Sequence, residues 1–179
     1  MVSGIYAATQ WLSLNVLYPL QTSVVPEIDL TATLVFLPHG VKIVAAWMFG
    51  WRALAYLLPA LAWRIANGGA IDIPRIEFAV MATFLMASAP LAFSLMRAFG
   101  IDVIGDRALA MNWRVLMFVG LVSSVMNAVA IHVIAFHELP ATEHLPGMFR
   151  IVAGDMVGLF VVLALLMLGA RWLRGWGQA

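Results

Sequence analysis

The chain has 179 residues, of which 64% are hydrophobic and 11% are charged, and its mean hydropathy is +0.98. A soluble domain is nearer half apolar and a quarter charged, so this composition excludes an ordinary soluble protein and predicts a membrane protein whose first partner is the lipid bilayer. Ten Lys and Arg residues against nine Asp and Glu residues supply no basic surface for nucleic acid. The absence of cysteine excludes disulfides, thiolate metal sites and cysteine nucleophiles.

Six apolar stretches are predicted to form membrane spans, because about 20 apolar residues are needed to cross a hydrocarbon core of about 30 Å. In chain order they cover residues 5–22, 30–49, 52–66, 77–99, 114–136 and 149–171. The third stretch is the shortest, which leaves open whether it crosses fully. We therefore expect an all-α integral membrane protein, a single domain over residues 1–179 built as a bundle of about six transmembrane helices.

The arginines predict the orientation, since short cytoplasmic loops are enriched in Lys and Arg. With both termini in the cytoplasm, three arginines lie outside, namely Arg64, Arg75 and Arg150. Six then lie inside: Arg52, Arg97, Arg107, Arg114, Arg171 and Arg174. The N-terminus lacks the basic start and cleavage site of a removable signal peptide, so it is expected to be a retained span. The prediction is a multi-pass protein of the bacterial inner (cytoplasmic) membrane.

Lys42 is the first candidate for a functional group, because an ionisable residue within a span is costly and often functional. It lies about 12 residues into the second predicted span, or roughly 18 Å deep if that span is helical. Pro38 and Gly40, one turn earlier, can open the helix and free carbonyls that a neighbour or a ligand must satisfy. The alternative is a lysine that snorkels, or pairs with a carboxylate, for packing alone.

Asp155, in the sixth predicted span, is the natural partner for a buried cation. It lies roughly 7 Å from the outer end of its span, so His39 is expected to lie nearer to it in depth than Lys42 does. A direct contact between Lys42 and Asp155 is therefore expected to be stretched. Gly154 and Gly158 form a small-xxx-small pattern whose expected role is close helix packing.

Two further polar residues lie on the fifth predicted span. His132 falls on the same stripe as Ser124, and Asn127 is adjacent to that stripe. His39, His132 and Asp155 are all predicted in the outer half of the membrane, where their convergence would make a polar pocket. The candidate ligand-binding or helix-pairing site consists of residues from three spans: Pro38, His39, Gly40, Lys42, Asn127, His132, Gly154, Asp155 and Gly158.

The histidines also suggest cofactor alternatives. His39 and His132 lie on separate spans and could be axial haem ligands, although no second pair exists. His137 and His144, in the loop expected before the sixth span, match no specific metal-ligand spacing. No metal site is predicted, and the cofactor is left unknown.

No enzyme is expected from this sequence. It contains no Gly-rich phosphate loop, no strand-turn-helix nucleophile and no helix with paired carboxylates. Ser123 and Ser124 have no nearby base in the sequence, so each is expected to bond a backbone carbonyl one turn back.

Three segments together resemble a known family. Residues 36–50 (FLPHGVKIVAAWMFG) followed by Arg52, residues 112–114 (NWR) and residues 154–158 (GDMVG) resemble the helices of MASE-type membrane-associated sensor domains, in the same order over residues 30–171. Such domains usually precede cyclase, phosphodiesterase or kinase modules and sense a signal; no such module follows the last predicted span here. The resemblance implies framework or signal-site roles for Pro38, Gly40, Arg52, Gly154, Asp155 and Gly158. His39 and Lys42 stand where that family is expected to have small or apolar residues.

Three functions are compatible with these features. The first is a sensor-like or scaffold module that acts through a membrane partner, either other membrane subunits or further copies of the chain. The second is an accessory subunit of a large respiratory or photosynthetic membrane complex. The third is the substrate-binding membrane component of a small-molecule importer, in which a mid-membrane Lys42 beside a broken helix would bind an anionic ligand.

Overall fold

The computed structural model describes residues 1–24, 33–67, 73–101 and 112–176, and every regular element within these ranges is helical. The elements are α1 (Val2–Leu12), a π-helix η1 (Ser13–Leu17), α2 (Tyr18–Val24), α3 (Leu37–Phe49), α4 (Arg52–Asn67), α5 (Arg75–Ala98), α6 (Trp113–Ile134) and α7 (Ala141–Trp176). The predicted all-α class is therefore confirmed for the described part of the chain.

Three of these helices, α5, α6 and α7, are long and apolar enough to cross a membrane. α3 has 13 residues and α4 has 16. At 1.5 Å per residue these two are about 20 and 24 Å long, which is less than the hydrocarbon thickness of about 30 Å. The structure thus supports a helical membrane protein, whereas the number of six spans and the orientation stay predictions.

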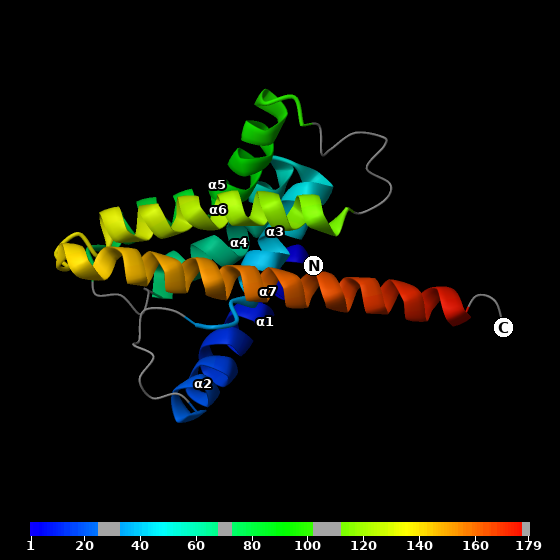
Figure 1. Cartoon of the computed structure of the whole chain (residues 1–179), viewed down its shortest axis with the longest axis horizontal. Helices are drawn as coiled ribbons and strands as arrows, with labels where there is room; N and C mark the ends of the chain where they lie inside the picture. Colours follow the sequence, from blue (N-terminus) through cyan, green and yellow to red (C-terminus); the bar gives the residue numbers. More distant parts are fainter. Residues whose placement is uncertain (25–32, 68–72, 102–111, 177–179) are drawn as a thin grey trace.

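The centre of the bundle is α3. It contacts α1, α4, α5, α6 and α7, and nine of its 13 residues are buried. In Figure 1, α6 lies above α3 and α7 lies below it. α6 also packs against α7 and against α5. Because α3 is packed against five other helices, its polar residues lie within protein rather than in lipid.

The second predicted span is shorter than expected. Residues 33–36 are not helical, and α3 begins only at Leu37, with a proline in its first turn. Three hydrogen bonds satisfy the backbone at this break: Leu34 N–H donates to Gln21 Oε1 (2.6 Å), Phe36 N–H donates to the Gly154 carbonyl (3.0 Å), and Leu37 N–H donates to Ser13 Oγ (3.3 Å). Irregular backbone at membrane depth is tolerated where protein supplies such partners.

The first predicted span is also interrupted. A π-helix, residues Ser13–Leu17, separates α1 from α2. The extra residue in a π turn changes the direction of side chains, and Ser13 is here fully buried against the start of α3. α2 has no buried residue, and Figure 1 shows it leaving the bundle.

α4, α5 and α6 follow their predicted spans closely, whereas α7 extends beyond its predicted span (149–171) at both ends. α7 begins at Ala141 instead of residue 149, so the segment expected to form an outer loop is helical and contains Pro146. With 36 residues α7 is about 54 Å long. Its C-terminal part extends well past the other helices (Figure 1).

Candidate functional site: a buried polar network

Two ionisable side chains from different helices meet inside the bundle. His39 Nδ1, on α3, lies 3.2 Å from Asp155 Oδ2, on α7. The side chains are 0% and 4% exposed. His39 Nε2 lies 3.2 Å from the Gly120 carbonyl on α6, and since a carbonyl only accepts, Nε2 carries a proton and donates it. The contact between His39 Nδ1 and Asp155 then needs one further proton, on the imidazole or on the carboxyl group.

Lys42 lies one turn further along α3 and bonds a different set of groups. Its Nζ donates to the Leu85 carbonyl (2.6 Å) and to Ser88 Oγ (2.9 Å), both on α5. It also donates to Asn127 Oδ1 on α6 (3.4 Å). An ammonium group has three donors, so all three are used by protein acceptors.

Asn127 connects Lys42 to the histidine–aspartate pair. Its Oδ1 accepts from Lys42, while its Nδ2 lies 3.4 Å from Asp155 Oδ2 and 3.5 Å from His39 Nδ1. Lys42 and Asp155 therefore interact through an amide rather than directly, in line with the expectation that a direct contact would be stretched. One asparagine on α6 thus relates charged groups from α3 and α7.

The serines of α5 and α6 complete this arrangement. Ser124 Oγ donates to Asp155 Oδ2 (2.7 Å), and Ser123 Oγ lies 2.9 Å from Ser88 Oγ. The expectation that Ser123 and Ser124 bond the carbonyls of their own helix missed these inter-helix contacts. Hereafter the polar network means seven buried residues of α3, α5, α6 and α7: His39, Lys42, Ser88, Ser123, Ser124, Asn127 and Asp155.

Glycines allow α7 to approach the start of α3 closely enough for these contacts. A Cβ added to Gly154 would lie 2.0 Å from the Thr33 carbonyl oxygen, and one added to Gly158 would lie 2.2 Å from the Phe36 carbonyl oxygen. A Cβ on Gly40, in α3, would meet Val162 of α7 at 2.8 Å. The first two obstacles are backbone atoms, which cannot move aside as a side chain can.

These positions give each predicted site residue a place. The structure brings together His39, Lys42, Asn127 and Asp155 in the polar network. Gly40, Gly154 and Gly158 lie where α7 meets the start of α3, and Pro38 is buried in the first turn of α3.

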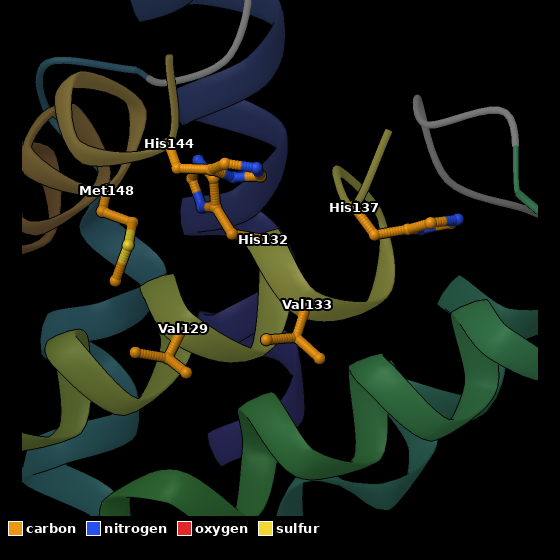
Figure 2. Close-up of a pocket in the computed structure, with 6 residues that line it drawn as sticks. All are labelled: Val129, His132, Val133, His137, His144 and Met148. Carbon is orange, nitrogen blue, oxygen red and sulfur yellow. The ribbon is translucent and has the colours of Figure 1, made fainter. Parts of the chain in front are cut away.

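His132 does not belong to this network, contrary to the expected convergence with His39 and Asp155. Its Nδ1 lies 3.0 Å from the Ala128 carbonyl, and its ring packs against His144, with ring centroids 5.6 Å apart (Figure 2). Asn127 and His132 are five residues apart, which is about 1.4 turns of α6, so their side chains point to different faces of the helix. His39 also has both ring nitrogens in contact with protein groups, which leaves neither available as a haem ligand.

Three residues in or beside the site escaped the sequence analysis. Ser88 sits in an apolar stretch where a serine has many harmless explanations, and Gly120 acts through its carbonyl, which every residue has. Ser13 is buried at the first residue of the π-helix, and no sequence feature indicated that helix. The only sequence signal for any of the three was that Ser88 is a polar residue within a predicted span.

Comparison with known protein families, curated proteins and solved structures found no match for this chain. The resemblance to MASE-type sensor domains therefore stays a prediction from the sequence.

Proposed function

We propose that the chain is a non-enzymatic, multi-pass protein of the inner membrane, a sensor-like or scaffold module that acts through a membrane partner. In this proposal both termini are cytoplasmic and the chain crosses six times, with residues 33–36 and α3 together forming one interrupted span. The resemblance to MASE-type sensor domains agrees with this role.

The observation that carries the proposal is the polar network of α3, α5, α6 and α7, in which His39 of α3 meets Asp155 of α7. Buried polar networks specify one arrangement of helices when all their members are paired, and they become costly when one bond is lost. The His39–Asp155 contact depends on a single proton, since without it two lone pairs would face each other at 3.2 Å. In this proposal, loss of that proton separates α7 from α3, and α7 thereby has the two states that a sensor needs.

The partner surface in this proposal is the distal part of α7. Leu165, Leu166 and Leu168 are 62%, 42% and 61% exposed, so apolar side chains point outward on several sides of the helix beyond Leu163. Figure 1 shows this part projecting past the bundle. A helix that is apolar all round suits a membrane interior, where a second helix can pack on it. A movement of α7 at Asp155 would reach this surface along one continuous helix.

An accessory subunit of a larger membrane complex is the second candidate, because the same projecting helix suits a permanent neighbour. The importer hypothesis loses its main support, since it relied on Lys42 to bind an anion. All three donors of Lys42 bond to Leu85, Ser88 and Asn127.

Cysteine cross-linking in native membranes tests the proposal, and the lack of native cysteine makes single substitutions clean. Leu168→Cys on distal α7 is compared with Val80→Cys on α5, whose side chain is similarly exposed at 58%. We expect a defined cross-linked product from position 168 and none from position 80. Mass spectrometry then identifies the partner as another protein or a second copy.

The same experiment with Asp155→Asn separates the two candidates. A sensor predicts that this substitution changes the yield of the product at position 168. An unchanged yield would favour a static accessory subunit over the sensor. A lack of any specific product at position 168 would contradict a role through a membrane partner.

A further inference from the structure

The end of α6 and the start of α7 meet at a pair of histidines that lies outside the polar network. His132, on α6, is 5% exposed, and its ring lies against the half-buried His144 of α7, with ring centroids 5.6 Å apart. Figure 2 shows these two rings close together, while His137 points away from them. Hereafter the α6–α7 junction means the contact of His132 with His144 and Gly147. Because histidine ordinarily changes its charge between pH 5 and 8, this junction contains groups that can respond to acid.

The surroundings of His132 suit a neutral imidazole and oppose a charged one. Its Nδ1 lies 3.0 Å from the Ala128 carbonyl, which only accepts, so Nδ1 carries the proton and Nε2 has a lone pair. The Nε2 side is filled by the buried Gly147, where an added Cβ would lie only 2.6 Å from Nε2. A second proton, on Nε2, would point an N–H at the Cα of Gly147, which offers no acceptor and leaves no space for water. A buried charge without a hydrogen-bond partner is costly, so protonation of His132 requires this contact to separate.

No carboxylate is placed to balance a charge at the junction. Among the residues that the structure describes, neither His132 nor His144 forms an ion pair, and the pair at this end joins the exposed His137 and Glu138 at 4.0 Å. The helices packed against α6 carry these other ionisable side chains: His39 and Lys42 on α3, Arg75, Glu77 and Arg97 on α5, and Glu143, Arg150, Asp155 and Arg171 on α7. Tyr6 of α1 shares an apolar cluster with the neighbouring Ile131. Two charged imidazoles in this contact would therefore repel each other without compensation.

The first turn of α7 is weakly joined to the rest of that helix. Pro146 has no N–H, so the backbone bond that would reach back to the Thr142 carbonyl is missing. Gly147 follows directly, and glycine constrains the backbone less than any other residue. Residues 141–145 can therefore swing away from α6 while the contacts of Gly154 and Gly158 with the start of α3 stay in place.

We propose that protonation of His132 beside His144 opens the α6–α7 junction, so that the first turn of α7 separates from α6 in acid and returns at neutral pH. His132 is neutral in the closed form, whereas water solvates its imidazolium in the open form. A solvated histidine takes up its proton near about pH 6.5, so the ratio of open to closed protein rises by up to about tenfold for each pH unit below that value. The response belongs to this chain alone and depends on neither the partner nor the polar network of the function proposed above.

Two spin labels in lipid nanodiscs measure this opening, and no native cysteine competes for the label. Val80→Cys on α5 and Leu145→Cys on the first turn of α7 replace side chains that are 58% and 76% exposed. We expect one distance between the labels at pH 8 and a second distance whose population grows as the pH is lowered to 5. His132→Asn keeps a donor for the Ala128 carbonyl but cannot be charged, so it should keep the pH 8 distance throughout. His137→Gln is the matched control and should respond to acid as the parent protein does.

Gly147→Ala tests the same contact without acid. Its Cβ would meet His132 Nε2 at 2.6 Å, so the second distance should already be present at pH 8. Three results would overturn the proposal: an unchanged distance between pH 8 and pH 5, an acid response in His132→Asn equal to that of the parent, or the closed distance in Gly147→Ala at pH 8. The second of these would assign the response to another group, such as His39 in the polar network. Circular dichroism at both pH values verifies that the helices stay folded in each variant.

Discussion

His39 Nδ1 on α3 lies 3.2 Å from Asp155 Oδ2 on α7, in a place where both side chains are almost completely shielded. The same carboxylate oxygen accepts from Ser124 at 2.7 Å, and Asn127 lies 3.4 Å away. One oxygen of one side chain therefore joins α3, α6 and α7. We therefore expect the Asp155 carboxylate to affect both the stability of the bundle and the position of α7.

Removal of the Asp155 carboxylate should destabilise the protein strongly. Asp155→Ala leaves Ser124, Asn127 and the Lys42 charge without their acceptor or counterion, so we expect a loss of about 3–5 kcal/mol in the free energy of unfolding. Asp155→Asn should cost less, because an amide can serve as either donor or acceptor at this point, although not as both. Unfolding by SDS titration in mixed micelles measures both, and equal costs would contradict the assigned contacts.

Substitution of Lys42 should be milder than substitution of Asp155. In Lys42→Met the new side chain fills a similar volume, and Ser88 keeps its bonds to Leu85 and Ser123. The main loss is the partner of Asn127 Oδ1, so we expect a destabilisation of about 1–1.5 kcal/mol or less. The His39 imidazole beside Asp155 can carry the proton that balances the remaining carboxylate.

The double substitution Lys42→Met/His39→Gln checks that explanation. It removes both cationic partners of Asp155, so its cost should exceed the sum of the two single costs by about 1 kcal/mol or more. Simple additivity in the same SDS titration would show that His39 does not balance the charge.

Alanine at the α7 glycines should prevent the close approach of α7 to α3. In Gly154→Ala and Gly158→Ala the added Cβ would meet backbone oxygens at 2.0 and 2.2 Å, so little folded protein should be recovered from the membrane. Gly169→Ala is the control on the same helix, since nothing lies within 4 Å of its Cβ. That control should be neutral or more stable by up to about 1 kcal/mol, because alanine favours a helix. Size-exclusion profiles and thermal unfolding compare the three.

Ser13 should contribute to stability through the start of α3. Ser13→Ala removes the acceptor for the buried Leu37 N–H and should cost about 1 kcal/mol, as the loss of a helix cap does. Ser23→Ala is the matched control, because this exposed serine donates to the Leu20 carbonyl of its own helix. Thermal unfolding should separate the two variants by several degrees, and equal midpoints would remove the capping role from Ser13.

Helix boundaries were predicted best where polar residues flank the helix. Arg75 and Arg97 bracket α5, and Asn112 caps the start of α6 through a bond from Arg114 N–H to its side chain (3.2 Å). Hydropathy could not predict the break before Leu37, because residues 30–36 are as apolar as a helix would be. That boundary depends on Gly154 and Gly158, which are far away in the sequence and leave space for non-helical backbone.

The candidate site was predicted only in part, because the sequence indicates the depth of a residue along its span but not the direction of its side chain. Depth along the spans correctly placed His39 nearer to Asp155 than Lys42, since each helix rises by a fixed amount per residue. Depth carries no information about the direction of a side chain around its helix. His132 was consequently grouped with His39, although it faces the start of α7 and the ring of His144.

The position of α7 relative to α3 can be measured with two spin labels in lipid nanodiscs. Met48→Cys near the end of α3 and Leu168→Cys on distal α7 are 60% and 61% exposed in the parent protein, and no native cysteine competes for the label. With the polar network intact we expect one narrow distance distribution between the labels. Asp155→Asn should shift it or add a second distance, while Gly169→Ala should leave it unchanged. An identical distribution in Asp155→Asn would contradict the claim that the polar network sets the position of α7.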